Sequence, residues 1–273
     1  MRSSNFVLNG MTRRTATQTA PYGQGQAYGQ PGYGYPAPGG YQPAAPPQAE
    51  AMTIDDVVIR TVGLLGIVGV VGALSWLFLP EAAYSVALFG SMIAGLILVL
   101  AISFMRITNP IAIAAYAVVE GVFVGVISKL YEQAFSGIVM QAAVGTFAVF
   151  IGMALVYKSK VIRVTSGFTK VMSGIGFGIL GLFLVSWLLS LFGSNVDIIG
   201  NPFDGKFSLL PLLITLGIIV WGALTFLIDF KVVEEGVRMG APRQFAWYAA
   251  FGIVVGLVFM YLQLLRLIGL IRE

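Results

Sequence analysis

Seven long apolar runs constrain the fold of this chain more than any other feature of its sequence. They cover approximately residues 57–80, 82–105, 107–128, 133–157, 171–193, 207–229 and 244–268. Each run is long enough to cross about 30 Å of hydrocarbon as a helix. In lipid, a single segment of this length satisfies its backbone hydrogen bonds only as an α-helix. The sequence therefore predicts an all-α fold, a polytopic transmembrane bundle of seven helices over residues 51–273.

The composition agrees with a membrane protein and excludes several kinds of active site. The chain is 58% hydrophobic and 10% charged, whereas about 25% of the residues of a soluble domain are charged. It contains no Cys and no His, which excludes disulfides, thiol nucleophiles, histidine relays and the usual zinc sites. We expect no cofactor and no enzymatic activity. The net charge of +4 is too small to indicate nucleic acid binding.

Residues 1–50 differ in composition from the rest of the chain. The tract PYGQGQAYGQPGYGYPAPGGYQPAAPPQ is rich in Gly, Pro, Tyr and Gln and has no apolar face to bury. No apolar region follows the early arginines, so the segment does not have the pattern of a secretory signal. We predict a disordered tail, which is either a solvated extension or an interaction segment.

The basic residues predict the orientation of the bundle. With seven crossings, the tail and the loops after the second, fourth and sixth runs lie on one side. Twelve of the sixteen Lys and Arg residues fall there: Arg2, Arg13, Arg14, Arg60, Arg106, Lys158, Lys160, Arg163, Lys170, Lys231, Arg238 and Arg243. We therefore predict a cytoplasmic N-terminus. The other side receives Lys129, Lys206, Arg266 and Arg272. We expect Arg266 and Arg272 to flank the outer end of the last helix. The alternative is that this helix does not fully cross the membrane.

Small residues recur inside several of the runs. Examples are GLLGIVGVVGA, GIGFGILG and AAFGIVVG. Such residues let transmembrane helices approach each other closely, so we interpret these stretches as helix-packing surfaces.

Charged residues within or at the ends of the runs are the candidate functional residues, because such groups usually face a partner or a wet cavity. They are Arg106, Glu120, Asp229 and Arg266. Arg106 ends the second run and Asp229 the sixth, and both runs lead to the inner leaflet, where the two side chains could form an ion pair. The alternative is that each only faces lipid headgroups. Glu120 lies about 20 Å into the third run, as either a neutral carboxyl bonded to a backbone carbonyl or a group on an ion or proton path.

The sequence resembles the Bax inhibitor-1 family of membrane proteins, in its bacterial branch, over about residues 55–273. The resemblance is carried by FMRITNPIAIAAYAVVEGVFVG, by QAAVGTFAVF with its Ala142-x-x-x-Thr146 spacing, by FLIDF and by YLQLLRLIG. The opening MRSSN is similar to the start of long-tailed actinobacterial members. The resemblance implies six helices around a hydrophobic seventh, in a bacterial plasma membrane.

The resemblance also implies a pH-sensitive calcium leak, controlled by an aspartate in each of the last two helices and latched by an arginine of the second. Arg106 matches the latch arginine, and Asp229 matches the first aspartate and so is the candidate Ca²⁺ or proton site. The second aspartate is expected near position 256, where this chain has Gly256. We hypothesise that Glu120 replaces it and that Gly256 leaves room for Glu120. The alternative is that Asp229 and Glu120 act at successive stations along a path.

Three classes of function compete. The first is a leak for Ca²⁺ or other cations. The second is a non-conducting modulator of another membrane protein, such as a membrane protease, with the tail as a docking segment. The third, an intramembrane aspartyl protease, needs two apposed aspartates within spans, and only Asp229 qualifies. We favour the leak. We expect the protein to be embedded in the lipid bilayer and to contact a membrane-protein partner.

Overall fold

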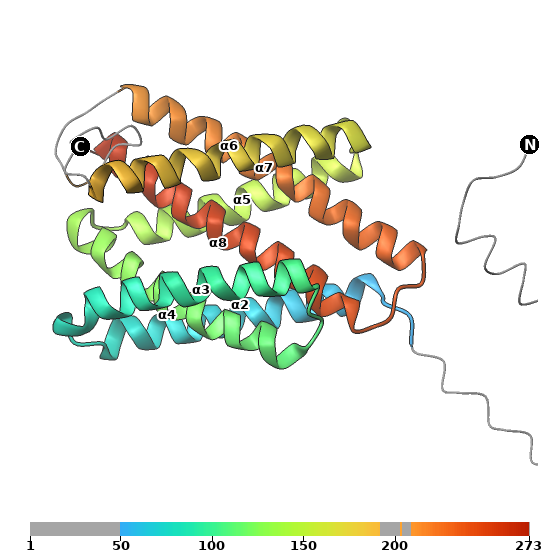
Figure 1. The fold of residues 1–273 in the computed structure, drawn as a ribbon, viewed down its shortest axis with the longest axis horizontal. Coiled ribbons are helices and arrows are strands. Elements are labelled where there is room, and N and C mark those ends of the chain that lie inside the picture. The colour runs from blue at the N-terminus through green and yellow to red at the C-terminus, as the bar shows by residue number, and fades with distance from the viewer. Residues whose placement is uncertain (1–49, 192–202, 204–208, 273) are drawn as a thin grey trace, which may run out of the picture. The chain divides into compact units, whose positions relative to one another are not determined.

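The computed structural model describes residues 50–191, 203 and 209–272, and its long elements are α-helices (Figure 1). Within these residues seven helices are long and apolar enough to span a membrane, which confirms the predicted all-α bundle. They are α2 (Ile54–Phe78), α3 (Tyr84–Met105), α4 (Pro110–Ala134), α5 (Ile138–Lys158), α6 (Ser166–Leu191), α7 (Leu209–Arg238) and α8 (Phe245–Arg272). A short 3₁₀ helix, η1 (Glu81–Ala83), precedes α3. The predicted tail lies outside the described residues, apart from Glu50.

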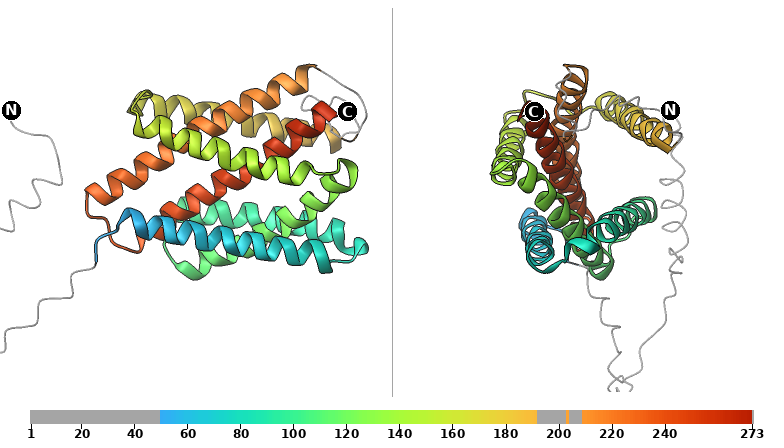
Figure 2. Two further views of the ribbon diagram at one scale, coloured as in Figure 1. Left: turned by 180° about the vertical axis from the view of Figure 1, so that it is seen from behind. Right: turned by 90° about the vertical axis from the view of Figure 1, so that its left-hand side faces the viewer.

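Helix α8 lies at the centre of the bundle. In the most apolar stretch of α8, 50% of the residues are buried, whereas the buried share of the corresponding stretch is 39% or less in each of the other helices. Helices α2, α4, α5 and α7 pack directly against it. Figure 2 shows α8 running between the group formed by α2, α3 and α4 and the group formed by α5, α6 and α7. Helix α3 packs on α4 and α6 on α7, so two of the six surrounding helices occupy outer positions.

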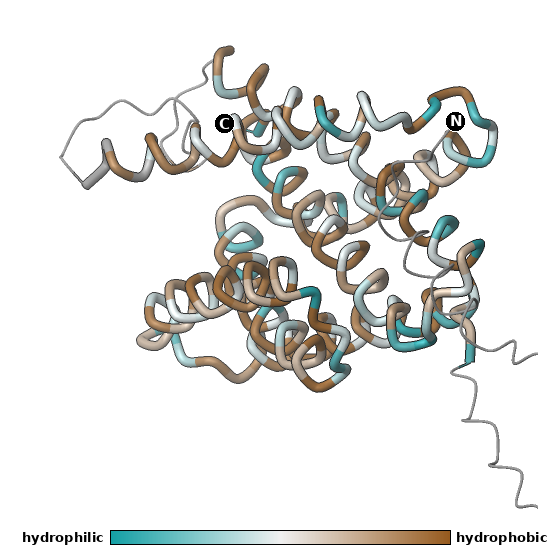
Figure 3. The backbone as a smooth tube through the Cα atoms, turned by 45° about the vertical axis from the view of Figure 1, so that its right-hand side comes forward, coloured by the Kyte–Doolittle hydropathy of each residue, from teal (hydrophilic) through white to brown (hydrophobic). Residues whose placement is uncertain are grey.

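The outer surface of the bundle is apolar. Figure 3 shows hydrophobic residues along the length of the helices. On α3, Val86 and Phe104 are 77% and 82% exposed. A surface of this kind suits contact with acyl chains and not with water.

Glycines bring α2 and α4 into backbone contact. A Cβ atom on Gly121 would lie 2.9 Å from the Val68 carbonyl oxygen, and one on Gly125 would lie 2.9 Å from the Gly72 Cα atom. No larger residue fits at such distances, so this crossing depends on glycine. A Cβ atom added at any of the other glycines of the 63–73 stretch would meet nothing within 4 Å outside its own part of the helix: Gly63, Gly66 and Gly69. Of the glycines in the predicted packing surface on α2, only Gly72 therefore lies at the crossing.

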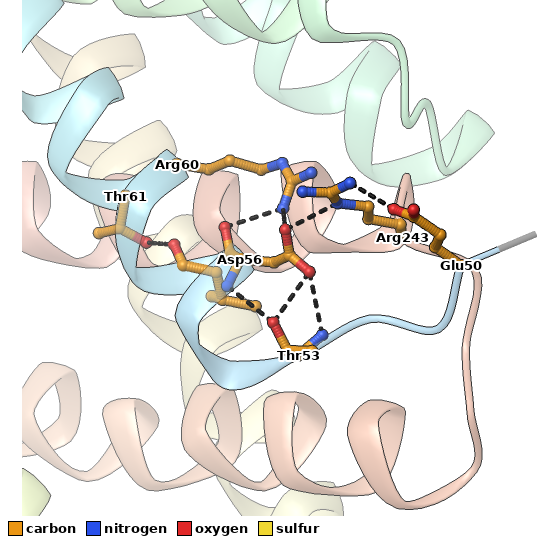
Figure 4. A network of polar contacts seen from close by, with 7 residues as sticks. Glu50, Thr53, Asp56, Arg60, Thr61 and Arg243 are labelled. Carbon is orange, nitrogen blue, oxygen red and sulfur yellow. Dashed lines mark hydrogen bonds and ion pairs between the residues drawn. The ribbon is translucent and has the colours of Figure 1, made fainter.

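An ionic network joins the start of α2 to the α7–α8 connection (Figure 4). The Nε atom of Arg243 donates to Asp56 Oδ1 at 2.9 Å, and its Nη1 atom pairs with Glu50. Arg60 pairs with Asp56 across one turn of α2 at 3.0 Å. Hydrogen bonds with Asp56 and Glu50 raise the pKa of Arg243, so this cation keeps its charge. The network lies at the end of the bundle where the α3–α4, α5–α6 and α7–α8 connections also lie (Figure 1).

Helix α7 extends beyond the predicted end of its apolar run, which is a correction to the sequence analysis. The run was expected to end at 229, but the helix continues to Arg238. Val233 and Gly236 are buried, so the packed face of α7 continues for two turns while Lys231 and Glu234 give the other face its polarity. Asp229 therefore lies within a helix and not at its end.

We expect Gly125→Val to destabilise the bundle, because the added side chain forces α2 and α4 apart at their backbone contact. Overpacking of this kind costs about 1–3 kcal/mol. Thermal unfolding of the purified protein in detergent measures the loss. Gly69→Val, on an open face of α2, is the matched control. Equal unfolding temperatures for the two variants would contradict the close crossing.

Candidate functional site

Asp229 faces a cleft between α3, α7 and α8. The cleft has a volume of about 420 Å³. Its hydroxyl groups come from Ser103, Thr225 and Tyr248, and much of the remaining wall is apolar or aromatic. Asp229 is half-buried, and a carboxylate in such surroundings is costly unless a proton, a cation or water balances it.

On α8, the residue that faces Asp229 is Gly252. A Cβ atom at position 252 would lie 3.7 Å from Asp229 Oδ1, an ordinary contact distance. Within the described part of the chain, Asp229 forms no ion pair and no side-chain hydrogen bond. The carboxylate thus has open space and a glycine beside it, and not the second aspartate that an aspartyl protease requires.

Gly256, one turn further along α8, makes room for an aromatic ring. A Cβ atom there would lie 2.9 Å from Phe226 Cε1. Phe226 is fully buried, and its ring packs against Phe150 and Phe230. Because the ring is held on several sides, an acid at position 256 would require the cluster to rearrange. The space that the sequence analysis assigned to Glu120 is therefore taken by Phe226.

Glu120 faces a second cavity, which lies between α3, α4 and α8 and has a volume of about 260 Å³. Tyr116, one turn earlier on α4, lines the same cavity. The residue that makes room for the Glu120 side chain is Gly95 of α3, where a Cβ atom would lie 3.2 Å from Glu120 Oε2. Glu120 is thus held between two helices and the central α8.

The two cavities meet at side chains of α8. Val255 and Phe259 line both the Asp229 cleft and the Glu120 cavity. Asp229 lies beside Gly252, and residues 252 and 259 are about 10 Å apart along the helix. The structure therefore places the two acids in neighbouring cavities, separated by an apolar partition, and not against each other.

Arg106 follows the last residue of α3 in a left-handed conformation, with φ of 49°. Its side chain is exposed, and it forms no ion pair with Asp229 among the described residues. Ser103, one turn earlier, lines the Asp229 cleft. Arg106 therefore stands just past the edge of the cleft, and the latch between the two residues stays a prediction.

The last helix runs from one end of the bundle to the other. At its C-terminus, Arg272 donates to the Ser136 carbonyl oxygen at 2.8 Å and to Gln141 Oε1 at 2.9 Å. These partners lie in and beside the α4–α5 connection. Arg266 is half-buried earlier on α8. Both arginines thus flank the end of a helix that is long enough to cross the membrane.

The acids do not form a metal-binding cluster. Within the residues that the structure describes, no group of three acidic residues is placed to hold a metal ion. Ca²⁺ takes about six to eight oxygen ligands, more than Asp229 and the neighbouring hydroxyls of Ser103 and Thr225 offer.

Sequence reasoning did not single out the residues that surround the two acids. Gly95 and Gly252 lie in apolar runs, where glycine was interpreted as a packing residue. The four-residue spacing of Gly252 and Gly256 was the available signal, because it places both on one face of α8. No pattern in the sequence indicates that Val255 and Phe259 line two neighbouring cavities.

Together these features define a class: a polytopic α-helical membrane protein with single carboxylates in separate cavities around a central apolar helix. The family model described as Bax inhibitor 1 like matches residues 8–273. The chain therefore belongs to the Bax inhibitor-1-like family, as the resemblance indicated. No curated protein matches the chain.

We expect Gly256→Ala to lower the thermal stability of the protein and Gly252→Ala to leave it nearly unchanged. The methyl group at 256 meets the buried Phe226 ring, whereas the one at 252 reaches only normal contact with Asp229. The expected cost at 256 is about 1–3 kcal/mol. Thermal unfolding in detergent compares two identical substitutions one turn apart. The reverse order of stability would contradict the assignment of these two positions.

Proposed function

We propose that this protein is a pH-sensitive cation leak, with Ca²⁺ as a candidate transported ion, that serves cation homeostasis without enzymatic activity. It would act in a bacterial plasma membrane with its N-terminus in the cytoplasm. The observation that carries the proposal is the pair of neighbouring cavities, each with one carboxylate, that meet at Val255 and Phe259 of the central helix.

Acidic residues at successive positions provide a path across an apolar bundle. Ionisable groups inside a membrane are costly and usually mark ion or proton pathways. Val255 and Phe259 line both cavities and therefore stand on the path of a cation that passes from Asp229 to Glu120. The Phe259 ring packs edge-on against Trp221, and a displacement of this ring is the movement by which we propose that the two cavities join.

The pH sensitivity rests on Asp229 and Arg106. A charged Asp229 attracts the Arg106 guanidinium, and an ion pair between them closes the cleft at the end where α3 terminates. Protonation removes the charge and, with it, the attraction. The leak therefore rises as the pH falls through the range in which Asp229 titrates.

Ca²⁺ flux into liposomes that contain the full-length protein, measured on both sides of neutral pH, tests the proposal. For Asp229→Asn we expect a flux that no longer changes with pH, because an amide does not titrate in this range. For Glu120→Gln we expect a flux about tenfold lower at each pH, the equivalent of about 1.4 kcal/mol in the barrier to passage.

Asp55→Asn and Glu81→Gln are the matched controls, because both remove an exposed carboxylate outside the two cavities. They should retain the flux and pH profile of the unmodified protein. A flux that is indifferent both to pH and to Asp229→Asn would count against the leak.

Arg106→Gln tests the latch. The variant cannot form the ion pair with Asp229, so we expect its flux at alkaline pH to rise to nearly the level seen at acidic pH. The same liposome assay measures this ratio, and Lys170→Gln, which removes an exposed cation from the same end of the bundle, is the control. An unaltered pH profile in Arg106→Gln would remove Arg106 from the mechanism.

A second candidate function is a non-conducting modulator of another membrane protein, such as a membrane protease. Gly256, at the position where the family resemblance implies a second aspartate, favours it. Pull-down from membranes with the full chain and with a variant lacking residues 1–50 separates the two functions. A partner that is lost with the tail supports the modulator, because a leak has no need of the tail.

A further inference from the structure

The end of the bundle that collects the basic residues contains a cavity that the proposed leak does not use. Its volume is about 680 Å³, and it lies between the end of α5, the α5–α6 connection and the end of α7. Two acidic and five basic residues line it: Glu234, Glu235, Lys158, Lys160, Arg163, Lys231 and Arg238. The cavity is therefore strongly basic.

Both acids of this cavity already have partners. Tyr157 donates a hydrogen bond to Glu234, and Lys231 lies 3.6 Å from Glu235 Oε1. Lys231 also donates to the Val164 carbonyl oxygen at 2.8 Å, which holds the α5–α6 connection against α7. The remaining cations form no ion pair with any described residue: Lys158, Lys160, Arg163 and Arg238. The cavity thus has positive charge for which this part of the chain provides no counter-charge.

The α5–α6 connection contributes Lys160 and Arg163 to the lining of the cavity. Lys160 has φ of 55°, which is uncommon for a residue with a side chain, and its amide donates to the Tyr157 carbonyl oxygen at 3.1 Å. The neighbouring Val161 is 77% exposed. An exposed apolar side chain between cations is typical of a segment that lies at the level of lipid headgroups.

An apolar groove begins where the basic cavity ends. It has a volume of about 640 Å³ and is formed mainly by α2, α5 and α7. Tyr157 and Glu234 line both the cavity and the groove. Beyond them the wall is almost entirely apolar, and Val58 and Phe147 on its two sides are 53% and 51% exposed. Thr61 contributes a hydroxyl group to this apolar part, and that hydroxyl donates a hydrogen bond to the Val57 carbonyl oxygen at 2.8 Å.

We propose that the basic cavity and the groove together form a binding site for an anionic phospholipid. The phosphate lies among Lys158, Lys160 and Arg163, and one acyl chain lies in the groove between α2 and α5. An anionic lipid would contact both the basic cavity and the apolar groove. Free phosphate has no apolar part to bind in the groove, and a zwitterionic lipid is only weakly attracted by the cations. The site is separate from the two acid cavities, so it does not depend on the proposed leak.

A simpler explanation accounts for only part of this arrangement. Basic residues at the ends of α5 and α7 offset the negative ends of the helix dipoles and follow the distribution of charge that sets membrane orientation. Neither effect requires the cations to line one cavity, or that cavity to continue into an apolar groove. The shared wall at Tyr157 and Glu234 is what favours a lipid.

Thermal unfolding of the full-length, delipidated protein in detergent tests the site, with phosphatidylglycerol, phosphatidylcholine or inorganic phosphate added. We expect only phosphatidylglycerol to raise the unfolding temperature. In Lys158→Gln the affinity for phosphatidylglycerol should fall about fivefold, the equivalent of about 1 kcal/mol for one cation. Lys170→Gln, an exposed lysine outside the cavity, should keep the original affinity.

Ala154→Phe tests the groove, because Ala154 lines it on α5 and the larger ring fills the space for the chain. We expect this variant to lose the stabilisation by phosphatidylglycerol, whereas Ala148→Phe, an exposed position of α5 outside the groove, should retain it. Native mass spectrometry of each variant with added phosphatidylglycerol gives a reading of binding that is independent of the unfolding temperature.

Three outcomes would overturn the proposal. Equal stabilisation by phosphatidylglycerol and phosphatidylcholine would mean that the cations do not recognise the headgroup, and an equal effect of inorganic phosphate would mean an anion site without a chain. Unchanged phosphatidylglycerol binding in both Lys158→Gln and Ala154→Phe would mean that neither half of the site contacts the lipid.

Discussion

A helix that is packed on most sides by other helices cannot carry an unpaired charge at low cost, and this constraint on α8 governs the rest of the structure. The helix has no acidic or basic residue between Phe245 and Leu265. Any charge near the centre of the bundle must therefore come from a surrounding helix. Asp229 on α7 and Glu120 on α4 do so from different directions, and the side chains of α8 keep them apart.

The glycines of α8 determine how closely the surrounding helices approach it. Gly252 leaves Asp229 beside an open cleft, and Gly256 accepts the ring of Phe226. Asp229 and Phe226 make these contacts from the same face of α7, within one turn of each other. Where the family resemblance implies a second carboxylate, this chain has aromatic packing. The consequence is that one acid comes from α7 and the other from α4, each in its own cavity.

The sequence alone was sufficient for the number of long helices, because hydropathy is a local property. It also marks Asp229 and Glu120 as candidates, because the cost of a charge within a span is local too, and their role stays a prediction. It failed at the end of α7, where Lys231 and Glu234 lowered the hydropathy while Val233 and Gly236 remained buried. It also failed to find Gly95 and Gly252 beside the acids. Those contacts depend on how the helices cross and rotate, which no single apolar run encodes.

The network around Arg243 gives the bundle a mechanical connection. Glu50 and Asp56 hold this arginine just before the first turn of α8, so the start of α2 is tied to the start of the central helix. Neither helix can slide along its own axis at this end without breaking an ion pair, and the two are therefore kept in register with each other.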